Sequence, residues 1–265
     1  MNIIGQSKLL SKINTYYTMK SLPKTMMFLG QAGCGKHTIA KYVADKFELE
    51  LVEIDDTVNA ADLDSFLYRT INTLYLIDLN KFSEKQQNQF LKFIEEPSKT
   101  VYIVLITDSE VNVLNTILNR CIKYHFEQYT KEQIEAITGS KVNDLAFDIF
   151  KTPGKLLNLT DESFKAVIDL ADAVVHKINY AKYPNALVIS TKINYKDLYN
   201  KIDFNLFFDT VEYLAFEDFK INNNNHSLII FNITNKFKQY ATRQNVIKEM
   251  LMFNYLTALW EAVQV

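Results

Sequence analysis

Short apolar runs alternate with amphipathic stretches over the first 127 residues, which is the pattern of a parallel α/β sheet. The predicted strands are the apolar runs, at 26–29, 49–54, 73–77, 101–106 and 122–126. The run 101–106 is the most β-branched stretch of the chain, so we expect it to form a central strand. Apolar residues at helical spacing predict helices between the strands, at 36–47, 62–70 and 84–94. We expect Ser83 to cap the last of these helices and Pro97 to end it.

The pattern becomes helical after residue 126, where the strand signals fade. Thr130, followed at the third position by Gln133, predicts a capping box that opens a helix at Lys131. Helix breaks are expected near Pro184 and at Asn222–Asn225. Three segments rich in large apolar residues predict a small helical bundle, at 204–219, 227–240 and 245–262. The expected fold class is therefore α/β followed by all-α.

Composition excludes several classes of protein. The chain has 265 residues, 48% of them hydrophobic, and a mean hydropathy of -0.09, which is enough material for more than one packed core. No apolar run reaches the roughly 18 residues of a membrane span, and the N-terminus has no signal-peptide core, so we expect a cytoplasmic protein without a membrane partner. The two cysteines, Cys34 and Cys121, exclude a disulfide scaffold and a self-contained four-cysteine zinc site. A net charge of -2 argues against strong stand-alone binding to nucleic acid.

Three of the six glycines lie within six residues, at Gly30, Gly33 and Gly35. Together with Lys36 they fit the phosphate-loop pattern G-x-x-x-x-G-K, between an apolar strand and a helix. Such glycines let backbone N–H groups surround phosphate oxygens, and the lysine reaches the outer phosphates. The alternative interpretation is a glycine-rich turn that binds no ligand.

The residues around this loop suit Mg²⁺ poorly. Ligation needs a hydroxyl after the lysine, and the chain has His37, whose imidazole is a poor ligand for a hard cation. Thr38 lies about 100° further around the helix and is not expected to substitute without a shift. Asp78 ends an apolar strand, as an acid that contacts Mg²⁺ through water would, but Leu79 follows it. Hydrolytic enzymes of the AAA+ class place a glutamate there, so we expect little ATP hydrolysis by this chain alone. ATP and Mg²⁺ are the candidate cofactors, and the residues leave their binding open.

Four further elements occur in order over about the first 126 residues. They are Ile3–Gln6, Gln87–Pro97, Thr107 at the end of the predicted central strand, and Ile117–Cys121. These elements resemble the I-x-G-Q, Q-N-A-L-L-K-x-L-E-E-P, sensor 1 and I-L-S-R-C motifs of the AAA+ clamp-loader subunits of replicative DNA polymerases, with asparagine for serine in the last. The resemblance implies a AAA+ P-loop domain, a small helical lid and a helical oligomerisation collar, at 1–127, 128–175 and 176–265. It makes the candidate nucleotide-binding set Gly30, Gly33, Gly35, Lys36, His37, Thr38, Asp78 and Thr107.

Departures from the family pattern indicate which member the chain resembles. The family's Asp-Glu-Ala-Asp appears as Asp78-Leu79-Asn80, and Gly154 stands where active subunits carry the sensor 2 arginine, with Lys155 only adjacent. The zinc-binding cysteine cluster is also missing. These losses look like the delta-prime subunit of bacterial DNA polymerase III, the member that lacks ATPase activity but donates an arginine finger. The collar is short for a cellular delta-prime, which fits a phage or reduced version.

Arg120 is the candidate arginine finger. The chain has only three arginines, Arg69, Arg120 and Arg243, among 29 basic residues, and one of them falls in the I-L-S-R-C-like motif. An arginine beside a neighbour's γ-phosphate can bridge two oxygens and neutralise developing charge. The alternative for Arg120 is a surface salt bridge at the start of a strand.

The resemblance implies a subunit of a hetero-oligomeric clamp-loader ring, part of a DNA polymerase III-type holoenzyme, that helps to load a sliding clamp onto primer-template DNA. Lys81, Lys85 and Lys92 would then track the DNA backbone, although their spacing is equally typical of a solvated helix face. Three rival functions stay open. One is an active motor subunit in which Thr38 and another acid compensate. The others are a P-loop phosphotransferase acting on a small molecule and a nucleotide-free scaffold with a relic loop.

Overall fold

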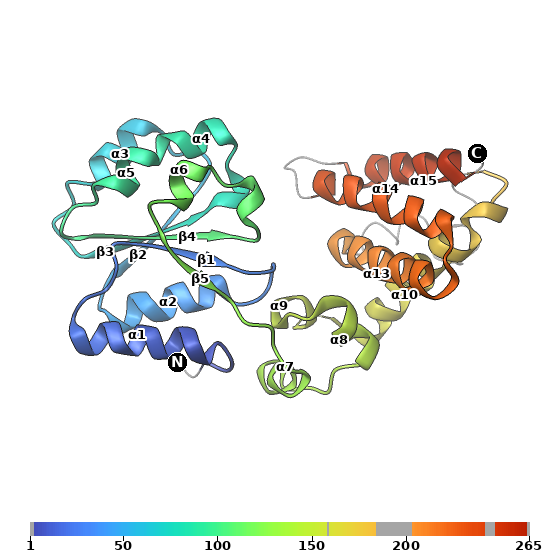
Figure 1. The fold of residues 1–265 in the computed structure, drawn as a ribbon, viewed down its shortest axis with the longest axis horizontal. Coiled ribbons are helices and arrows are strands. Elements are labelled where there is room, and N and C mark those ends of the chain that lie inside the picture. Colours follow the sequence, from blue (N-terminus) through green and yellow to red (C-terminus); the bar gives the residue numbers. More distant parts are fainter. Residues whose placement is uncertain (1–2, 158, 184–202, 242–246, 264–265) are drawn as a thin grey trace. The chain divides into compact units, whose positions relative to one another are not determined.

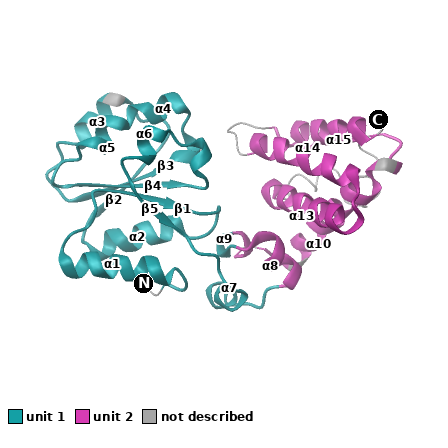
Figure 2. Ribbon diagram, viewed as in Figure 1, with its two compact units in different colours: residues 1–142, 152–154 teal, residues 143–151, 155–265 magenta. Residues whose placement is uncertain are grey.

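The computed structural model of the protein describes residues 3–157, 159–183, 203–241 and 247–263 (Figure 1). They form two compact units, the first of residues 1–142 and 152–154 and the second of residues 143–151 and 155–265 (Figure 2). Pro184, Arg243 and the start of the predicted segment 245–262 lie outside the described residues. Within the described part, no helix is long and apolar enough to cross a lipid bilayer.

The first unit is built on a five-stranded parallel sheet of order β2-β3-β4-β1-β5. Its strands are β1 (Thr25–Leu29), β2 (Glu50–Ile54), β3 (Thr73–Asp78), β4 (Val101–Thr107) and β5 (Ile122–His125). The predicted central position of 101–106 is confirmed, since β4 is the middle strand and is buried along nearly its whole length. Leu29 pairs with Thr107 and Asp78 with Ile106, so the carboxyl ends of β1, β3 and β4 meet at one edge of the sheet.

Helices cover both faces of this sheet (Figure 1). On one face lie α1 (Ser7–Met19) and α2 (Lys36–Lys46), where Ile13 and Val43 pack in one cluster with Phe28 of β1. The opposite face carries four short helices, α3 (Ala60–Phe66), α4 (Glu84–Gln89), α5 (Leu91–Glu95) and α6 (Asn115–Leu118). Helix α1 is an addition to the elements that the sequence pattern predicts.

The helix predicted at 84–94 is divided into α4 and α5. Ser83 and Gln86 form the capping box that opens α4, so the predicted start is confirmed. At Phe90 the backbone N–H donates to Gln87 O at 3.1 Å, a tighter turn than the α-helical one, and the buried Phe90 ring meets Phe82 edge-on at 5.0 Å. Packing of this ring locally overrides the continuous helical pattern.

Helix α7 (Lys131–Thr138) begins at the predicted capping box. Gln133 N donates to Thr130 Oγ1 at 3.3 Å, and Thr130 N donates to Gln133 Oε1 at 3.1 Å. Gly139 then ends the helix in the left-handed region at φ 72°, where a glycine costs least.

The second unit is helical. Its elements are α8 (Asp144–Phe150), the end of α9 (Pro153–Leu156), α10 (Asp161–Lys177), the short turn η3 (Ile178–Tyr180), α13 (Phe204–Asn222), α14 (Asn225–Ala241) and α15 (Lys248–Val263). The predicted break at Asn222–Asn225 is confirmed, because α13 ends there with Asn223 at φ 50°. The boundaries at 127/128 and 175/176 stay predictions.

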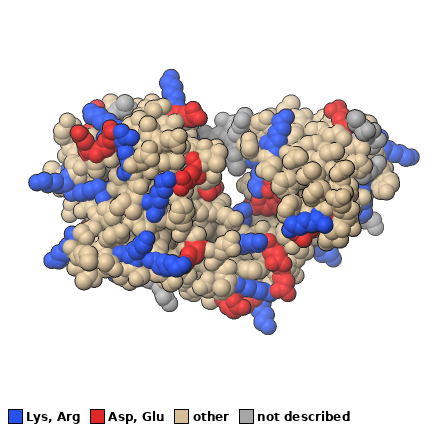
Figure 3. All heavy atoms as spheres, viewed as in Figure 1, with Lys and Arg blue, Asp and Glu red and all other residues tan. Residues whose placement is uncertain are grey.

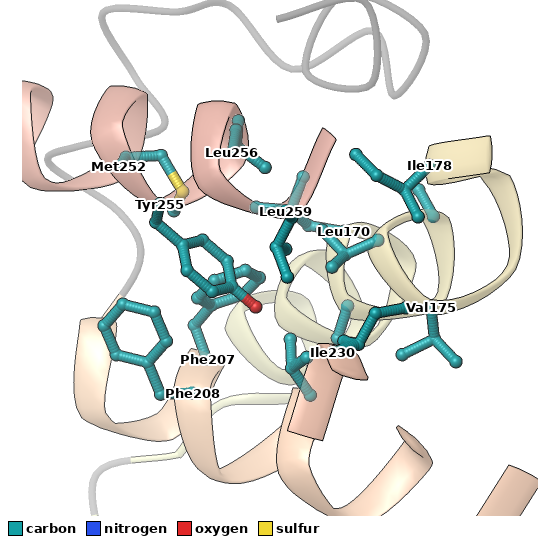
Figure 4. Packing of buried hydrophobic residues seen from close by; sticks show 14 of the residues in the cluster. Leu170, Val175, Ile178, Phe207, Phe208, Ile230, Met252, Tyr255, Leu256 and Leu259 are labelled. Atoms are coloured by element: carbon teal, nitrogen blue, oxygen red, sulfur yellow. The ribbon is translucent and has the colours of Figure 1, made fainter. Parts of the chain in front are cut away.

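Aliphatic side chains and a few aromatic rings fill the core of this helical unit (Figure 4). Tyr255 of α15 is fully buried, and Phe207 and Phe208 of α13 meet its ring edge-on at centroid distances of 6.0 and 5.1 Å. The Tyr255 hydroxyl pairs with Thr234 Oγ1 at 2.8 Å, which satisfies a polar atom that burial would otherwise penalise. Burial raises the pKa of Tyr255, so its hydroxyl stays protonated.

Candidate nucleotide site and arginine finger

The phosphate loop follows β1 and leads into α2, as its sequence predicts. Gly33 and Gly35 have φ of 82° and 93°, the left-handed region that favours glycine, and Gly35 is the N-cap of α2. A Cβ atom at Gly30 would lie 2.8 Å from Phe126 Cβ and 2.9 Å from Cys34 Sγ. Each glycine of the motif therefore answers a local backbone or space requirement of the loop.

Lys36 is held by oxygens of the chain itself. Its side chain is 6% exposed, and Nζ donates to Gly30 O, to Gln31 O at 3.2 Å and to Asp108 Oδ1 at 2.7 Å. An ammonium group has three donors, so all three are engaged. The Asp108 carboxylate neutralises the charge that a phosphate would need.

Asp108 is a site residue that sequence reasoning missed. It follows Thr107 directly, and the pairing of Thr107 with Leu29 brings the end of β4 beside the start of the phosphate loop. The sequence does contain one indication of its role, which is that Asp108 is an acid directly after Thr107, the expected sensor 1 residue. His37 and Thr38, by contrast, are exposed on the first turn of α2.

Asp78 and Thr107 are joined through Asn80. Asp78 Oδ1 accepts from Asn80 N at 3.1 Å and from Asn80 Nδ2 at 2.8 Å. Asn80 Oδ1 in turn accepts from Thr107 Oγ1 and from Asp108 N, both at 3.2 Å. Leu79 is 2% exposed and packs in the apolar cluster on the sheet face that α3 to α6 cover. It therefore contributes no proton acceptor for an attacking water.

Tyr129, a second residue that the sequence analysis missed, lies between the opening element and the phosphate loop. Its hydroxyl donates to Cys34 O at 2.9 Å, and a Cβ on Gly5 would lie 2.6 Å from its ring. Gln6 fixes the same region, because its side-chain amide donates to Glu127 O and accepts from Glu127 N, both at 2.8 Å. The space between Gly5 and the loop is thus filled by an aromatic ring, and burial raises the pKa of Tyr129.

Gly154, where the resemblance leads us to expect a sensor 2 arginine, packs directly on the phosphate loop. Gly154 N donates to Gly33 O at 2.9 Å, and a Cβ on Gly154 would lie 2.7 Å from Gly33 Cα. Thr152 Oγ1 donates to Ala32 O at 3.0 Å. A side chain at position 154 would therefore require the loop to move. Lys155, the adjacent cation, is bonded to Asp209.

Arg120 lies between α6 and β5, and its contacts come from the sheet face opposite α2. Glu95 Oε1 accepts from Arg120 Nε at 2.7 Å and also from Nη2. Arg120 Nη1 donates to Thr116 O at 2.7 Å, and the arginine side chain remains 35% exposed.

Burial raises the pKa of the adjacent Cys121 thiol to about 12, so that thiol is no nucleophile at neutral pH.

The three candidate DNA-contacting lysines lie on or before α4 and α5. Lys92 Nζ pairs with Asp64 Oδ1 at 2.8 Å, and this contact raises the pKa of Lys92. Lys81 and Lys85 are exposed. On the face shown in Figure 3, basic and acidic side chains are interspersed. The DNA role of these lysines stays a prediction.

The side chains around the phosphate loop offer few ligands for a metal ion. Throughout 3–157, 159–183, 203–241 and 247–263, no group of three or more His, Cys, Asp or Glu residues could hold a metal ion. Asp78 is the one acid of the predicted set, and its Oδ1 is engaged by Asn80. The phosphate loop could supply backbone N–H groups to a nucleotide, whereas Mg²⁺ would have to be held mainly by phosphate and water.

Part of the chain is similar in sequence to known proteins. A family model described as "DNA polymerase III, delta subunit" matches residues 53–130. The delta-prime subunit of DNA polymerase III from Bacillus subtilis is 36% identical over 63 residues, which cover 23% of this chain and 19% of that protein. Residues 53–130 are thus similar to subunits of DNA polymerase III.

Longer matches to this chain are found among gamma and tau subunits of DNA polymerase III. The gamma subunit of DNA polymerase III from Buchnera aphidicola is 26% identical over 167 residues, covering 50% of this chain and 46% of that protein. The tau subunit from Escherichia coli is 26% identical over 169 residues, covering 50% of this chain and 26% of that protein. The chain thus spans less than half the length of these relatives.

A solved structure supports the AAA+ fold. A variant of RuvB from Thermotoga maritima superposes with a TM-score of 0.53 at 14% identity, covering 76% of this chain and 86% of the RuvB chain. At this identity the likeness concerns the fold alone. It agrees with the predicted fold class of a parallel-sheet AAA+ domain followed by helices.

Proposed function

We propose that this chain is a clamp-loader subunit of delta-prime type. It inserts Arg120 into the ATP site of an adjacent subunit in a hetero-oligomeric ring and hydrolyses little or no ATP itself. The ring opens a sliding clamp and loads it onto primer-template DNA, with Lys81, Lys85 and Lys92 along the DNA backbone. In this proposal residues 128–175 form the lid and 176–265 the collar that assembles the ring.

The observation that carries the proposal is the contrast between Arg120 and the chain's own nucleotide site. Arg120 is partly exposed, intact within its motif, and bonded only to Glu95 and Thr116 among the described residues. In the chain's own candidate nucleotide site, Lys36 is paired with Asp108, and the buried Leu79 follows Asp78. An arginine that serves no local phosphate, next to a site without a water-activating acid, suits catalysis in a neighbour.

An omission and rescue experiment tests this function. A ring is assembled from the partner subunits with and without this chain, and DNA-stimulated ATP turnover is measured. Omission should lower turnover, and the chain with Lys36→Ala should restore it, because its own phosphate loop does no catalytic work. If Lys36→Ala fails to restore turnover while the variant chain still assembles, the chain is a motor subunit and the proposal is wrong.

A further inference from the structure

We infer that Glu95 is a positioning residue that holds the Arg120 guanidinium with one edge turned outward for a partner's phosphate. The inference rests on the proposed arginine-finger function and adds a second residue to it. Glu95 itself touches no substrate, and its action passes through Arg120.

The argument starts from the hydrogen-bond geometry of the guanidinium. This planar group carries five N–H donors, one on Nε and two on each terminal nitrogen. Glu95 Oε1 accepts from Nε and Nη2, which share one edge of the group. Thr116 O accepts from Nη1, at 2.7 Å. Two donors are left, one on Nη1 and one on Nη2, and the described residues offer them no acceptor.

The two remaining donors form a usable pair. Nε and Nη2 present one edge of the plane. Of the two Nη1 hydrogens, one points back along the side chain and the other points outward beside Nη2. We assign the first to Thr116 O, the carbonyl oxygen four residues earlier in the chain. The unbonded hydrogens therefore lie side by side on the outer edge of the guanidinium. Two parallel N–H groups match two oxygens of a phosphate. The structure thus leaves free the edge that a bidentate phosphate contact needs.

Both partners of Arg120 are fixed by buried neighbours. Glu95 ends α5, directly after Phe93 and Ile94, which are 1% and 2% exposed. Thr116 lies in α6 beside Ile117, which is 0% exposed, and the Arg120 backbone N donates to Ile117 O at 3.0 Å. An exposed ion pair between two flexible side chains would carry little positional information. Here the arginine bridges two short helices anchored in one apolar cluster.

The expected effect of Glu95 is on catalysis more than on binding. Its carboxylate offsets the charge of Arg120, so it does not raise the general attraction for anions. Its contribution is to hold the guanidinium in place before the reaction, and preorganised charge is what lowers a barrier at a developing oxyanion. Removal of Glu95 should therefore lower kcat of the neighbouring ATP site and leave KM for ATP nearly unchanged.

Arginine side-chain NMR of the full chain tests the positioning directly. With three arginines in the sequence, ¹⁵N-arginine labelling gives few Nε–H signals, and Arg120→Lys identifies the one from Arg120. We expect this signal to exchange with water about tenfold more slowly than in Glu95→Ala. Glu96→Ala is the matched control, since Glu96 is exposed and adjacent, and it should leave the signal unchanged. An Arg120 signal that is the same in wild type and Glu95→Ala overturns the positioning role.

Turnover of the assembled complex separates this inference from the proposed function. Arg120→Ala should lower DNA-stimulated turnover, Glu95→Ala should lower kcat about tenfold, and Glu95→Gln should keep much of the activity because its carbonyl oxygen still accepts. If Arg120→Ala lowers turnover and Glu95→Ala does not, Glu95 is structural and the finger stands. If Arg120→Ala has no effect, the proposed function fails first. A double variant slower than Arg120→Ala alone shows that Glu95 acts elsewhere and contradicts the inference.

Discussion

The Lys36 ammonium group and the Asp108 carboxylate are 2.7 Å apart, joined across 72 residues of sequence. The pair forms because β1 and β4 are neighbours in the sheet, so the phosphate loop starts beside the residue that follows β4. It neutralises the lysine on which phosphate binding depends. At the proposed nucleotide site, this pair would compete with a phosphate group for Lys36.

Replacing Asp108 by asparagine should improve nucleotide binding. Asp108→Asn keeps the shape of the side chain and removes the charge that Lys36 faces, so we expect affinity for ATPγS to rise about tenfold. Titration of the purified chain, with and without Mg²⁺, measures this. Asp64→Asn is the control, since Asp64 also pairs with a lysine but lies away from the loop. Equal affinities of wild type and Asp108→Asn would mean that the pair does not limit binding.

Gly154→Ala should disturb the phosphate loop. The added Cβ would lie 2.7 Å from Gly33 Cα and 2.9 Å from Gly33 O, both backbone atoms that cannot rotate away. We expect a loss of about 1–3 kcal/mol in the free energy of unfolding, measured in urea, with faster amide exchange at residues 32–35. Gly139→Ala serves for comparison, because a Cβ there meets nothing within 4 Å and only the φ of 72° opposes it. Its destabilisation should leave exchange at the loop unchanged, and an unchanged loop in Gly154→Ala would refute the steric account.

Asp209→Ala should destabilise the helical unit strongly. Asp209 has a side chain 7% exposed and pairs with Lys155 and with Lys238, the latter at 2.7 Å. Burial opposes the charge on Lys238, but Asp209 and Glu212 raise its pKa overall. Without Asp209, Lys155 would lose its carboxylate partner and Lys238 would keep only Glu212. The expected loss in unfolding free energy is about 3 kcal/mol, against less than about 1 kcal/mol for Asp64→Ala at the surface. Equal losses for the two variants would speak against a buried network.

The Cys121 thiol should make stability fall at high pH. Burial raises its pKa from 9.0 to about 12, so the folded state keeps a proton that the unfolded state releases. The stabilising contribution is complete below pH 9 and is lost as the pH rises from 9 towards 12. Unfolding free energies measured across this range should decline less steeply in Cys121→Ala than in wild type. Parallel curves for the two proteins would exclude the thiol as a source of the decline.

The sequence predicts what depends on local pattern and misses what depends on the sheet. The buried β-branched run at 101–106 and the capping box at Thr130 are both confirmed, because each signal lies within a few residues. The roles of Asp108 and Tyr129 depend on contacts with Lys36 and Cys34 that only the folded sheet brings together. Their own positions carry no motif of the phosphate loop.

Two further cases, Gly154 and helix α1, compare the sequence prediction with the structure. The sequence predicts that Gly154 stands where an arginine is expected, and the structure adds its contact with Gly33. Helix α1 was not predicted, although Leu9 and Ile13 are buried and Leu10 and Tyr16 pack beside them at helical spacing. This element could have been found from the sequence.

The central claim is that Arg120 works in a neighbour's ATP site, and one substitution tests it most directly. Single-turnover ATP hydrolysis is measured in the assembled, DNA-bound complex carrying Arg120→Ala, with Arg69→Ala as the matched control, since Arg69 pairs with Glu50 at 3.0 Å on the edge strand β2. Arginine fingers supplied in trans contribute on the order of a thousandfold or more at the site they serve. The account predicts that Arg120→Ala abolishes the hydrolysis phase of one site while assembly and ATP binding persist and Arg69→Ala behaves as wild type. Hydrolysis phases identical in wild type and Arg120→Ala would contradict it.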